Sequence, residues 1–443
     1  FLISIKYLLI NNLMNLLLSN KIKIAFLLLL VIISFYRSPY IFLEGRFMGE
    51  EGSHYFKNAY ENNFLHHLLY FVKTAGYYNL ITNLLTELST YVPLIYAPLV
   101  TVYGSLIVTL TPVFLILFKD SYLFKNDNEK IIGSLIFFIT YPHVSEVWAN
   151  SVNSQIYLFF VSLLILYLKP SVKKNKILSP VLLLLSGLSG IYSCILTPLY
   201  FVKYHYTKAK RDLINTNILI VCSLIQLALI FYSRFTDQLY KTSEISSLFN
   251  LDKIINLFYN FFAKPIFGRQ PIYFVYENFG FGFFGYISML YLFSAISVIV
   301  MSILIKFKFI NFFLKDHVFQ SLILIYILVF TVVIFGADNL QTSGRYATIP
   351  GILFLLIIFY LAANFPVRAI SNFFSILILI SIVAGFYEFR PSTINVKHQY
   401  IKFLDCVNCP QWKTEVENWK KNQNYQISIW PYPKKKLELS KSK

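Results

Sequence analysis

Long apolar segments, separated by short clusters of Lys and Arg, recur along the whole chain and constrain its fold more than any other feature. Hydrophobic residues make up 57% of the 443 positions, whereas charged residues make up only 14%. A soluble core cannot bury that much apolar surface, and such segments are typical of helices that cross a bilayer. The sequence therefore predicts an all-α fold, a polytopic transmembrane helical bundle of about 10–11 membrane segments.

The formal net charge of +18 would by itself suit a nucleic-acid-binding protein. The basic residues, however, stand in short clusters between apolar segments, for example at 169–176 and 203–211. Clusters of this kind mark the cytoplasmic loops of membrane proteins. We therefore expect a lipid bilayer as the surrounding partner, no nucleic acid, and a cytoplasmic N-terminus.

The segment between these two basic clusters decides the topology. If both clusters are cytoplasmic, residues 177–202 must enter the membrane and return to the same side. The stretch 186–190 (SGLSG) would allow a hairpin of two short helices broken at that point. A single span is the alternative, and it would invert every later segment. The hairpin keeps both basic clusters on the cytoplasmic side, so it is the topology we expect.

With this hairpin, most of the polar and non-basic segments fall on one external face. They are the first external loop, three later loops and the tail: residues 37–89, 142–153, 233–278, 336–345 and 388–443. The predicted domains are a transmembrane domain (1–387) and a short external C-terminal tail (388–443). Within the first external loop we expect amphipathic interfacial helices. The chemistry of the chain is therefore expected on this external face.

Residues 49–55 (GEEGSHY) follow the first apolar segment and place two adjacent carboxylates beside an expected membrane face. Adjacent carboxylates raise each other's pKa, and partial burial raises it further, which suits a general base near neutral pH. Flanking glycines allow a substrate to approach closely. The alternative is a solvated acid, or a cap for a helix through residues 55–60. This segment gives two candidate catalytic residues, Glu50 and Glu51, and two candidate substrate-binding residues, His54 and Tyr55.

Three polar residues recur at helical spacing in the next external loop: Glu146, Asn150 and Asn153. Amides, a carboxylate and neighbouring aromatic rings are the groups with which a protein binds sugars, because each sugar hydroxyl needs hydrogen-bond partners. The alternative is an ordinary interfacial aromatic belt with polar caps. We take the three residues as candidates for substrate binding.

Arg345 and Tyr346 lie at the external mouth of a late apolar segment. Arg345 is the only basic residue of its loop, and its guanidinium suits a phosphate or pyrophosphate at membrane level. Snorkelling of this side chain to lipid head groups is the alternative. Arg269, in the long loop, is a further candidate for substrate binding.

Residues that bind metals form no strong pattern in this chain. Four histidines match no metal-site template: His54, His66, His67 and His143. We expect no dedicated metal site and no certain cofactor, although a divalent cation beside Glu50 or Glu51 would be compatible with the acidic pair. Cys406 and Cys409 form a C-x-x-C without a second pair, which favours a local disulfide over a zinc site if the tail faces an oxidising compartment.

The order of these features resembles the GT-C superfamily of integral-membrane glycosyltransferases, the group similar to dolichyl-phosphate-mannose mannosyltransferases. Members carry an acidic pair directly after the first span, followed by a Tyr and an Ala on a helix. This chain has Glu50-Glu51, Tyr55 and Ala59 in that order. Its pair is Glu-Glu, where the family usually has Asp-Glu. A late Arg-Tyr, here Arg345-Tyr346, is similar to a donor-phosphate contact of several members.

The resemblance implies a reaction. A polyprenyl-phosphate sugar would enter from the bilayer with its phosphate held by Arg345, and Glu50, or Glu51 as second choice, would deprotonate the acceptor hydroxyl. The sugar would pass to a glycan, lipid or protein acceptor with inversion. The tail, at 412–419 and 429–431, resembles that of a bacterial branch, which implies the bacterial inner membrane and a periplasmic active face.

Two other classes of protein stay open at this point. A polysaccharide polymerase or ligase would also have large external loops, but it relies on basic loop residues rather than on an acidic pair in the first loop. A lipid or solute transporter would need charged or broken-helix sites near the membrane midplane and two related halves. The sequence has no convincing internal repeat, so a glycosyltransferase is the function we expect.

Overall fold

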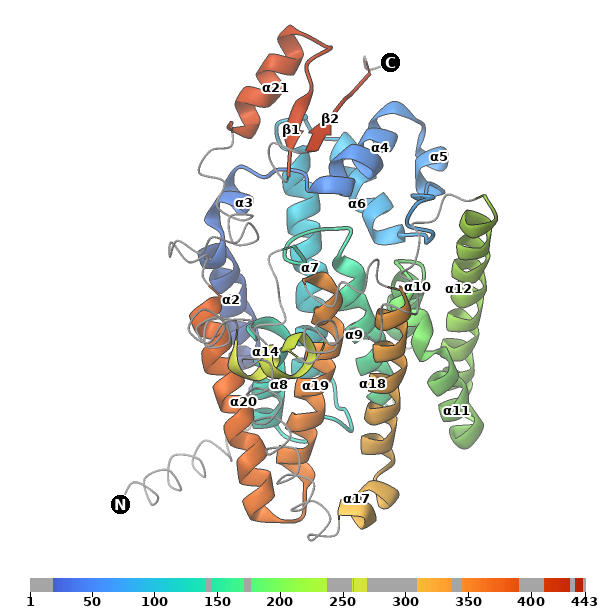
Figure 1. Cartoon of the computed structure of the whole chain (residues 1–443), viewed down its shortest axis with the longest axis vertical. Helices are drawn as coiled ribbons and strands as arrows, with labels where there is room; N and C mark the ends of the chain where they lie inside the picture. The colour runs from blue at the N-terminus through green and yellow to red at the C-terminus, as the bar shows by residue number, and fades with distance from the viewer. Residues whose placement is uncertain are drawn as a thin grey trace, which may run out of the picture. The chain divides into compact units, whose positions relative to one another are not determined.

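The computed structural model describes residues 19–140, 146–170, 177–236, 257, 259–268, 309–336, 344–389, 410–430 and 435–440. Within these ranges the chain is mainly helical, as the apolar segments predicted (Figure 1). The described part contains one small sheet, in which β1 (Ile427–Ile429) pairs antiparallel with β2 (Lys435–Leu437). The all-α prediction is therefore confirmed at the level of secondary structure.

Five described helices are long and apolar enough to cross a membrane: α7 (Ala97–Phe118), α12 (Lys210–Phe235), α18 (His317–Gly336), α19 (Arg345–Asn364) and α20 (Arg368–Glu388). Two shorter helices are apolar as well: α9 (Ser154–Tyr167) and α10 (Leu178–Gly187). Helix α12 leaves large apolar side chains such as Leu224 and Phe231 exposed, which is costly in water and favourable in lipid. These helices are compatible with a multi-pass membrane protein.

The chain divides into two compact units. Unit 1 consists of residues 1–121, 145–241 and 390–443, and unit 2 consists of residues 122–144 and 242–389. Unit 1 contains both the first loop, with its acidic pair, and the described part of the C-terminal tail.

Unit 1 begins with α2 and α3, continues through the short helices of the first loop, and ends with the tail elements α21, β1 and β2. The elements not yet given are α2 (Asn20–Arg37), α3 (Pro39–Leu43), η1 (Glu51–Phe56), α4 (Lys57–Glu61), α5 (Phe64–Leu68), α6 (Leu80–Thr90), η2 (Tyr192–Leu196), α11 (Thr197–Thr207) and α21 (Trp412–Lys421). Helix α7 packs against α2, α6 and α9. In Figure 1 the tail elements α21, β1 and β2 (red) lie at the same end of unit 1 as α4 and α6 (blue).

Helices α10 and α11 form the hairpin that the flanking basic clusters predicted. Where α10 begins, the Arg211 guanidinium of α12 donates to the Ser179 hydroxyl at 3.1 Å. Where α10 ends, the Gln226 amide of α12 donates to the Gly187 carbonyl at 3.1 Å. Helix α10 therefore runs parallel to α12. Gly187 makes this approach possible, because a Cβ there would lie 2.7 Å from Cys222 Cβ.

Helix α11 returns along α12 in the opposite direction. Near its start, the Thr197 and Ser223 hydroxyls are 2.8 Å apart, and further along Lys203 Nζ lies 3.7 Å from Asp212 Oδ1. The chain thus reverses between the two short helices, around residues 188–191. The start of α10 and the end of α11 consequently lie at the same end of unit 1, which is what two basic clusters on one membrane side require.

Gln226 fastens the first loop to the apolar helix α12. Its side-chain amide pairs with the backbone of Tyr78, since Oε1 accepts from Tyr78 N at 2.9 Å and Nε2 donates to Tyr78 O at 3.0 Å. The side chain is 1% exposed. An amide in an apolar helix is costly unless every polar atom has a partner, and here the partners are backbone groups of two other segments.

We expect Gln226→Leu to destabilise the fold by about 1–3 kcal/mol, because it removes three hydrogen bonds and leaves Tyr78 N without its side-chain partner. The measurement is the thermal unfolding midpoint of the protein in nanodiscs. Leu224→Ala, at an exposed position of the same helix, is the control and should shift the midpoint much less. A Gln226→Leu midpoint equal to that of the wild type would contradict the fastening role.

Unit 2 packs α19 against α18, α20 and α8 (Asp127–Phe138). Its other described helices are η4 (Tyr259–Ala263), α14 (Lys264–Phe267) and α17 (Phe309–Lys315). Asp316 begins α18 by accepting from Phe319 N at 3.0 Å, and its second oxygen accepts from the Tyr360 hydroxyl of α19 at 2.9 Å. This carboxylate therefore both caps one apolar helix and joins it to the next.

Candidate functional site

The acidic pair lies where the first loop turns back over unit 1. Gly49 has a φ of 39°, a backbone conformation that glycine adopts without strain. The turn directs the next residues into the short helix η1, which begins at Glu51. As a result, the two neighbouring carboxylates point into different surroundings.

Glu51 is the buried member of the pair, with 1% of its surface exposed. Its Oε1 accepts from Ser151 N at 3.0 Å and from Ser151 Oγ at 2.5 Å, while Oε2 accepts from Met48 N at 3.2 Å. Burial raises the pKa of Glu51, and these hydrogen bonds oppose that rise. The carboxylate joins the first loop to the segment before α9, so its contacts are those of a structural anchor.

Glu50 is only partly buried, and its carboxylate makes no hydrogen bond or ion pair with the described residues. Its charge raises the pKa values of Tyr55 and Tyr70, in both cases as a smaller contribution than burial. Glu50 therefore lies within electrostatic range of these two rings. Of the two acids, it is the one whose oxygen atoms are available to an incoming group.

The segment before α9 is held together by its own side chains. The amides of Asn150 and Asn153 both donate to the Glu146 carbonyl, at 3.2 and 2.9 Å, and Asn150 Oδ1 accepts from Val152 N at 2.9 Å. Both asparagines are nearly fully buried. The three predicted sugar-binding residues thus shape the turn that presents Ser151 to Glu51. Direct contact with a sugar stays a prediction for them.

An aromatic cluster follows the acidic pair. Tyr55 is 1% exposed and packs edge-on against Tyr70, with ring centroids 5.8 Å apart, and Val72 and Val152 complete the contact. Nearby, the Gln155 amide donates to the Tyr77 hydroxyl at 3.0 Å. Sequence reasoning selected Tyr55 but missed the other two rings. The run Tyr77-Tyr78 in the first loop was the available signal.

The C-terminal tail is folded onto the residues that precede Glu50, which the sequence did not predict. Trp430 N donates to the Phe47 carbonyl at 3.1 Å, and Gly49 N donates to the Trp430 carbonyl at 2.6 Å. These bonds form a parallel bridge between Met48 and Trp430. The backbone just before the acidic pair is therefore held by a segment almost 400 residues later in the chain.

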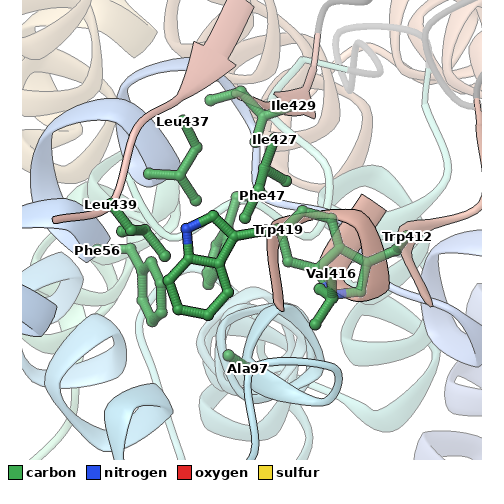
Figure 2. Close-up of a cluster of buried hydrophobic side chains, with 10 residues drawn as sticks. All are labelled: Phe47, Phe56, Ala97, Trp412, Val416, Trp419, Ile427, Ile429, Leu437 and Leu439. Carbon is green, nitrogen blue, oxygen red and sulfur yellow. The ribbon is translucent and has the colours of Figure 1, made fainter. Parts of the chain in front are cut away.

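A buried apolar cluster fixes this contact, as Figure 2 shows. Seven of its members come from the tail: Trp412, Val416, Trp419, Ile427, Ile429, Leu437 and Leu439. The other three are Phe47, Phe56 and Ala97, from the first loop and the start of α7. Gly52 admits the tail closely, because an added Cβ would lie 3.0 Å from Ile429 Cδ1. The tail is thus part of the core of unit 1.

Polar contacts complete the docking of the tail. Glu415, which is 2% exposed, accepts from Ser428 N at 2.6 Å and from the Tyr425 hydroxyl at 2.7 Å, and so joins α21 to β1. The Trp412 indole donates to the Leu94 carbonyl at 3.2 Å. The predicted C-x-x-C of Cys406 and Cys409 lies outside the described residues.

The predicted arginine sites lie elsewhere. Arg345 and Tyr346 begin α19 in unit 2, where the Arg345 guanidinium donates to the Tyr346 hydroxyl at 3.2 Å and lies 5.1 Å from its ring centroid. Arg269 and His143 lie outside the described residues. Unit 1 therefore holds the acids and their neighbours, whereas the described guanidinium predicted to bind phosphate belongs to unit 2.

His67 is a structural histidine. It is fully buried, and its ring nitrogens lie 3.0 Å from Asn58 Oδ1, 3.1 Å from the Asn83 carbonyl and 3.0 Å from Thr86 Oγ1. Burial lowers the pKa of His67 to about 4. Within the described ranges, no three side chains of His, Cys, Asp or Glu gather as a metal site would require.

The lowered pKa of His67 makes the stability of the first loop depend on pH. The unfolded chain binds the proton near pH 6.5 and the folded chain near pH 4. Stability is therefore complete above pH 6.5 and falls as the pH drops through this window. We expect His67→Gln to flatten the curve of unfolding midpoint against pH between these values. His54→Gln, at an exposed position, should retain most of the slope, and an unchanged slope in His67→Gln would contradict the assignment.

In comparisons with known proteins, no protein-family model, no curated protein and no solved structure matches the chain. A functional interpretation therefore depends on the geometry described above. The decisive part of that geometry is the pair of adjacent acids, of which one is buried and bonded and the other is open.

Proposed function

We propose that this chain is an integral-membrane glycosyltransferase that moves a sugar from a polyprenyl-phosphate donor to a hydroxyl acceptor, with Glu50 as the general base. The observation that carries this proposal is the division of the acidic pair. Glu51 has hydrogen bonds to both carboxylate oxygens, whereas Glu50, the next residue, has none with the described residues. A base must be fixed in place and yet free to accept a proton, and this arrangement meets both conditions.

The proposed reaction is a nucleophilic substitution at the anomeric carbon of the donor sugar. Glu50 takes the proton of the acceptor hydroxyl as the acceptor oxygen forms its bond to the anomeric carbon. The bond from that carbon to the phosphate oxygen breaks on the opposite side, so the configuration inverts. The polyprenyl phosphate leaves as an anion with the bonding electron pair, and Glu50 then returns its proton to water.

The surroundings of Glu50 support a sugar as substrate. Tyr70, which is partly exposed, lies within electrostatic range of its charge, and the Gln155 amide donates a hydrogen bond to the Tyr77 hydroxyl in the same unit. Aromatic rings with an apolar face and a polar edge are suited to sugars, which present both C–H and hydroxyl groups. In this proposal, the side chains of Ser151, Asn150 and Asn153 hold these aromatic and amide groups in place around Glu50.

The proposal includes a membrane arrangement. The chain would be a bundle of about 10–11 membrane segments, with the first loop, the turn before α9 and the tail on the periplasmic side of a bacterial inner membrane. The five apolar helices and the hairpin of α10 and α11 support it. Arg345 would hold the donor phosphate through its guanidinium.

The test is a transfer assay with purified protein in nanodiscs. The donors are a panel of labelled polyprenyl-phosphate sugars, and the matched controls are the same sugars as nucleotide diphosphates. We expect release of polyprenyl phosphate and loss of label from at least one lipid donor, and no turnover of the nucleotide sugars. Turnover of nucleotide sugars alone would contradict the proposed donor class.

A further inference from the structure

The tail strand β2 lies along the helix that follows Glu50. Lys435 of β2 pairs with Ile429 of β1, and Ile429 packs on Gly52 of η1. Beyond the end of the strand, Ser440 N donates to the Glu61 carboxylate of α4 at 2.9 Å. The segment 435–440 is thus fastened at both ends beside η1 and α4. This places Lys435 next to the beginning of η1.

The helix presents a row of charged and polar side chains along this strand. Glu50, His54, Lys57 and Glu61 follow one another at spacings of four, three and four residues along the π-helix η1 and the α-helix α4. Desolvation lowers the pKa of His54, Glu50 raises it, and Lys435 and Lys57 lower it further. These charges therefore lie within electrostatic range of one ring, the exposed imidazole of His54.

The two lysines that act on the His54 ring, Lys57 of α4 and Lys435 of β2, have no partner among the described residues. Neither Lys435 nor Lys57 makes an ion pair or a side-chain hydrogen bond with a described residue. The next residue of the strand differs, since Lys436 Nζ donates to the Ser428 hydroxyl at 3.0 Å. Successive side chains of a strand point to opposite faces, so the side chains of Lys435 and Lys436 lie on opposite faces of β2. Two ammonium groups without a partner among the described residues therefore lie within electrostatic range of the His54 ring, as does the carboxylate of Glu50.

The stereochemistry of the proposed reaction indicates which of the two substrates, donor or acceptor, these lysines would contact. In an inverting displacement, the base and the leaving phosphate lie on opposite sides of the anomeric carbon. Cations on the same side as Glu50 consequently face the acceptor rather than the donor phosphate. An ammonium group binds phosphate as a point charge, so it does not require the phosphate oxygens to lie in one fixed orientation.

We propose that Lys435, Lys57 and His54 form a phosphate-binding site for the acceptor, which carries a phosphate group close to the hydroxyl that Glu50 deprotonates. The inference rests on the proposed function for the identity of this ligand as the acceptor. The binding of a phosphate at this place rests on the strand, the helix and the two lysines alone. The phosphate could belong to a lipid head group or to a soluble phosphorylated compound.

The experiment measures binding of inorganic pyrophosphate to the full chain in phosphatidylcholine nanodiscs by calorimetry. We expect Lys435→Gln and Lys57→Gln each to weaken binding by about threefold to tenfold, because each removes one charge contact. Lys420→Gln, at an exposed position of α21, is the matched control and should bind like the wild type. A wild-type protein that does not bind, or a Lys435→Gln variant that binds as tightly as Lys420→Gln, would overturn the site.

Two further arms separate the source of the phosphate and the two proposals. One arm replaces part of the nanodisc lipid with phosphatidic acid. Pyrophosphate binding should become weaker if a lipid phosphate occupies the site, and should stay unchanged if the ligand is soluble. Either result supports the site. Glu50→Gln should retain or strengthen pyrophosphate binding, because it removes a repelling charge, while it lowers the rate of sugar transfer by about a hundredfold or more. If Glu50→Gln transfers sugar at the wild-type rate, the base assignment fails and the phosphate site stands.

Discussion

Glu50→Gln is expected to lower the transfer rate by about a hundredfold to ten-thousandfold while leaving the fold intact, since general-base catalysis contributes a factor of this size. The carboxylate makes no hydrogen bond with the described residues, so the amide takes its place without breaking a contact. The measurement is the rate of sugar release from the lipid donor, together with the unfolding midpoint of the same sample.

Two variants make the Glu50 result specific. Glu417→Gln, at an exposed position of the tail helix, removes the same charge far from the acidic pair in sequence and should retain wild-type turnover. Glu50→Asp keeps the carboxylate and should retain part of the activity. Full turnover by Glu50→Gln with an unchanged midpoint would exclude this residue as the base.

Glu51→Gln is expected to act on stability rather than on the chemical step. The carboxylate accepts from Ser151 N, from Ser151 Oγ and from Met48 N, and its replacement by an amide sets an N–H donor against at least one of these donors. A buried group that loses its partner costs about 1–3 kcal/mol, and more when the bond was to a charge. We expect a lower unfolding midpoint and a smaller yield of folded protein.

The pH dependence of stability distinguishes the effect of Glu51 from that of His67, because the two contributions change with pH in opposite directions. Because burial raises the pKa of Glu51 above 4.5, the folded chain binds this proton more readily than the unfolded chain. The contribution of Glu51 to stability therefore decreases as the pH rises from 4.5 through the folded pKa, and then stays constant. Glu51→Gln should remove this slope. A Glu51→Gln protein as stable as the wild type at neutral pH would contradict the anchor role.

Several elements of both units were predictable from the sequence because they depend on local pattern. Apolar runs of sufficient length predicted α7, α12, α18, α19 and α20. Basic clusters on both sides of residues 177–202, with SGLSG between them, predicted the reversal between α10 and α11. The glycine-flanked pair after the first apolar segment indicated where the acids would be, but adjacent residues with the same side chain cannot be told apart by pattern.

The docking of the tail was not predictable in the same way. Residues 412–440 read as a polar external segment with a few aromatics, and nothing in their local pattern names a partner. The contact of Ile429 with Gly52 and the backbone pairing of Trp430 with Phe47 and Gly49 join segments that are far apart in the chain. Such pairings depend on the shape of the assembled surface, which single-sequence periodicity does not carry.

The sequence by itself determined a helical chain with membrane-length apolar segments, a reversal at 177–202 and an acidic pair in the first loop. Only the tertiary structure separated Glu50 from Glu51. The reason is that burial is a property of the fold: Ser151, a hundred residues later, supplies two of the hydrogen bonds that hold one carboxylate. The same fold leaves the neighbouring carboxylate open, and it brings Lys435 of the tail within electrostatic range of His54, the ring on which the charge of Glu50 also acts.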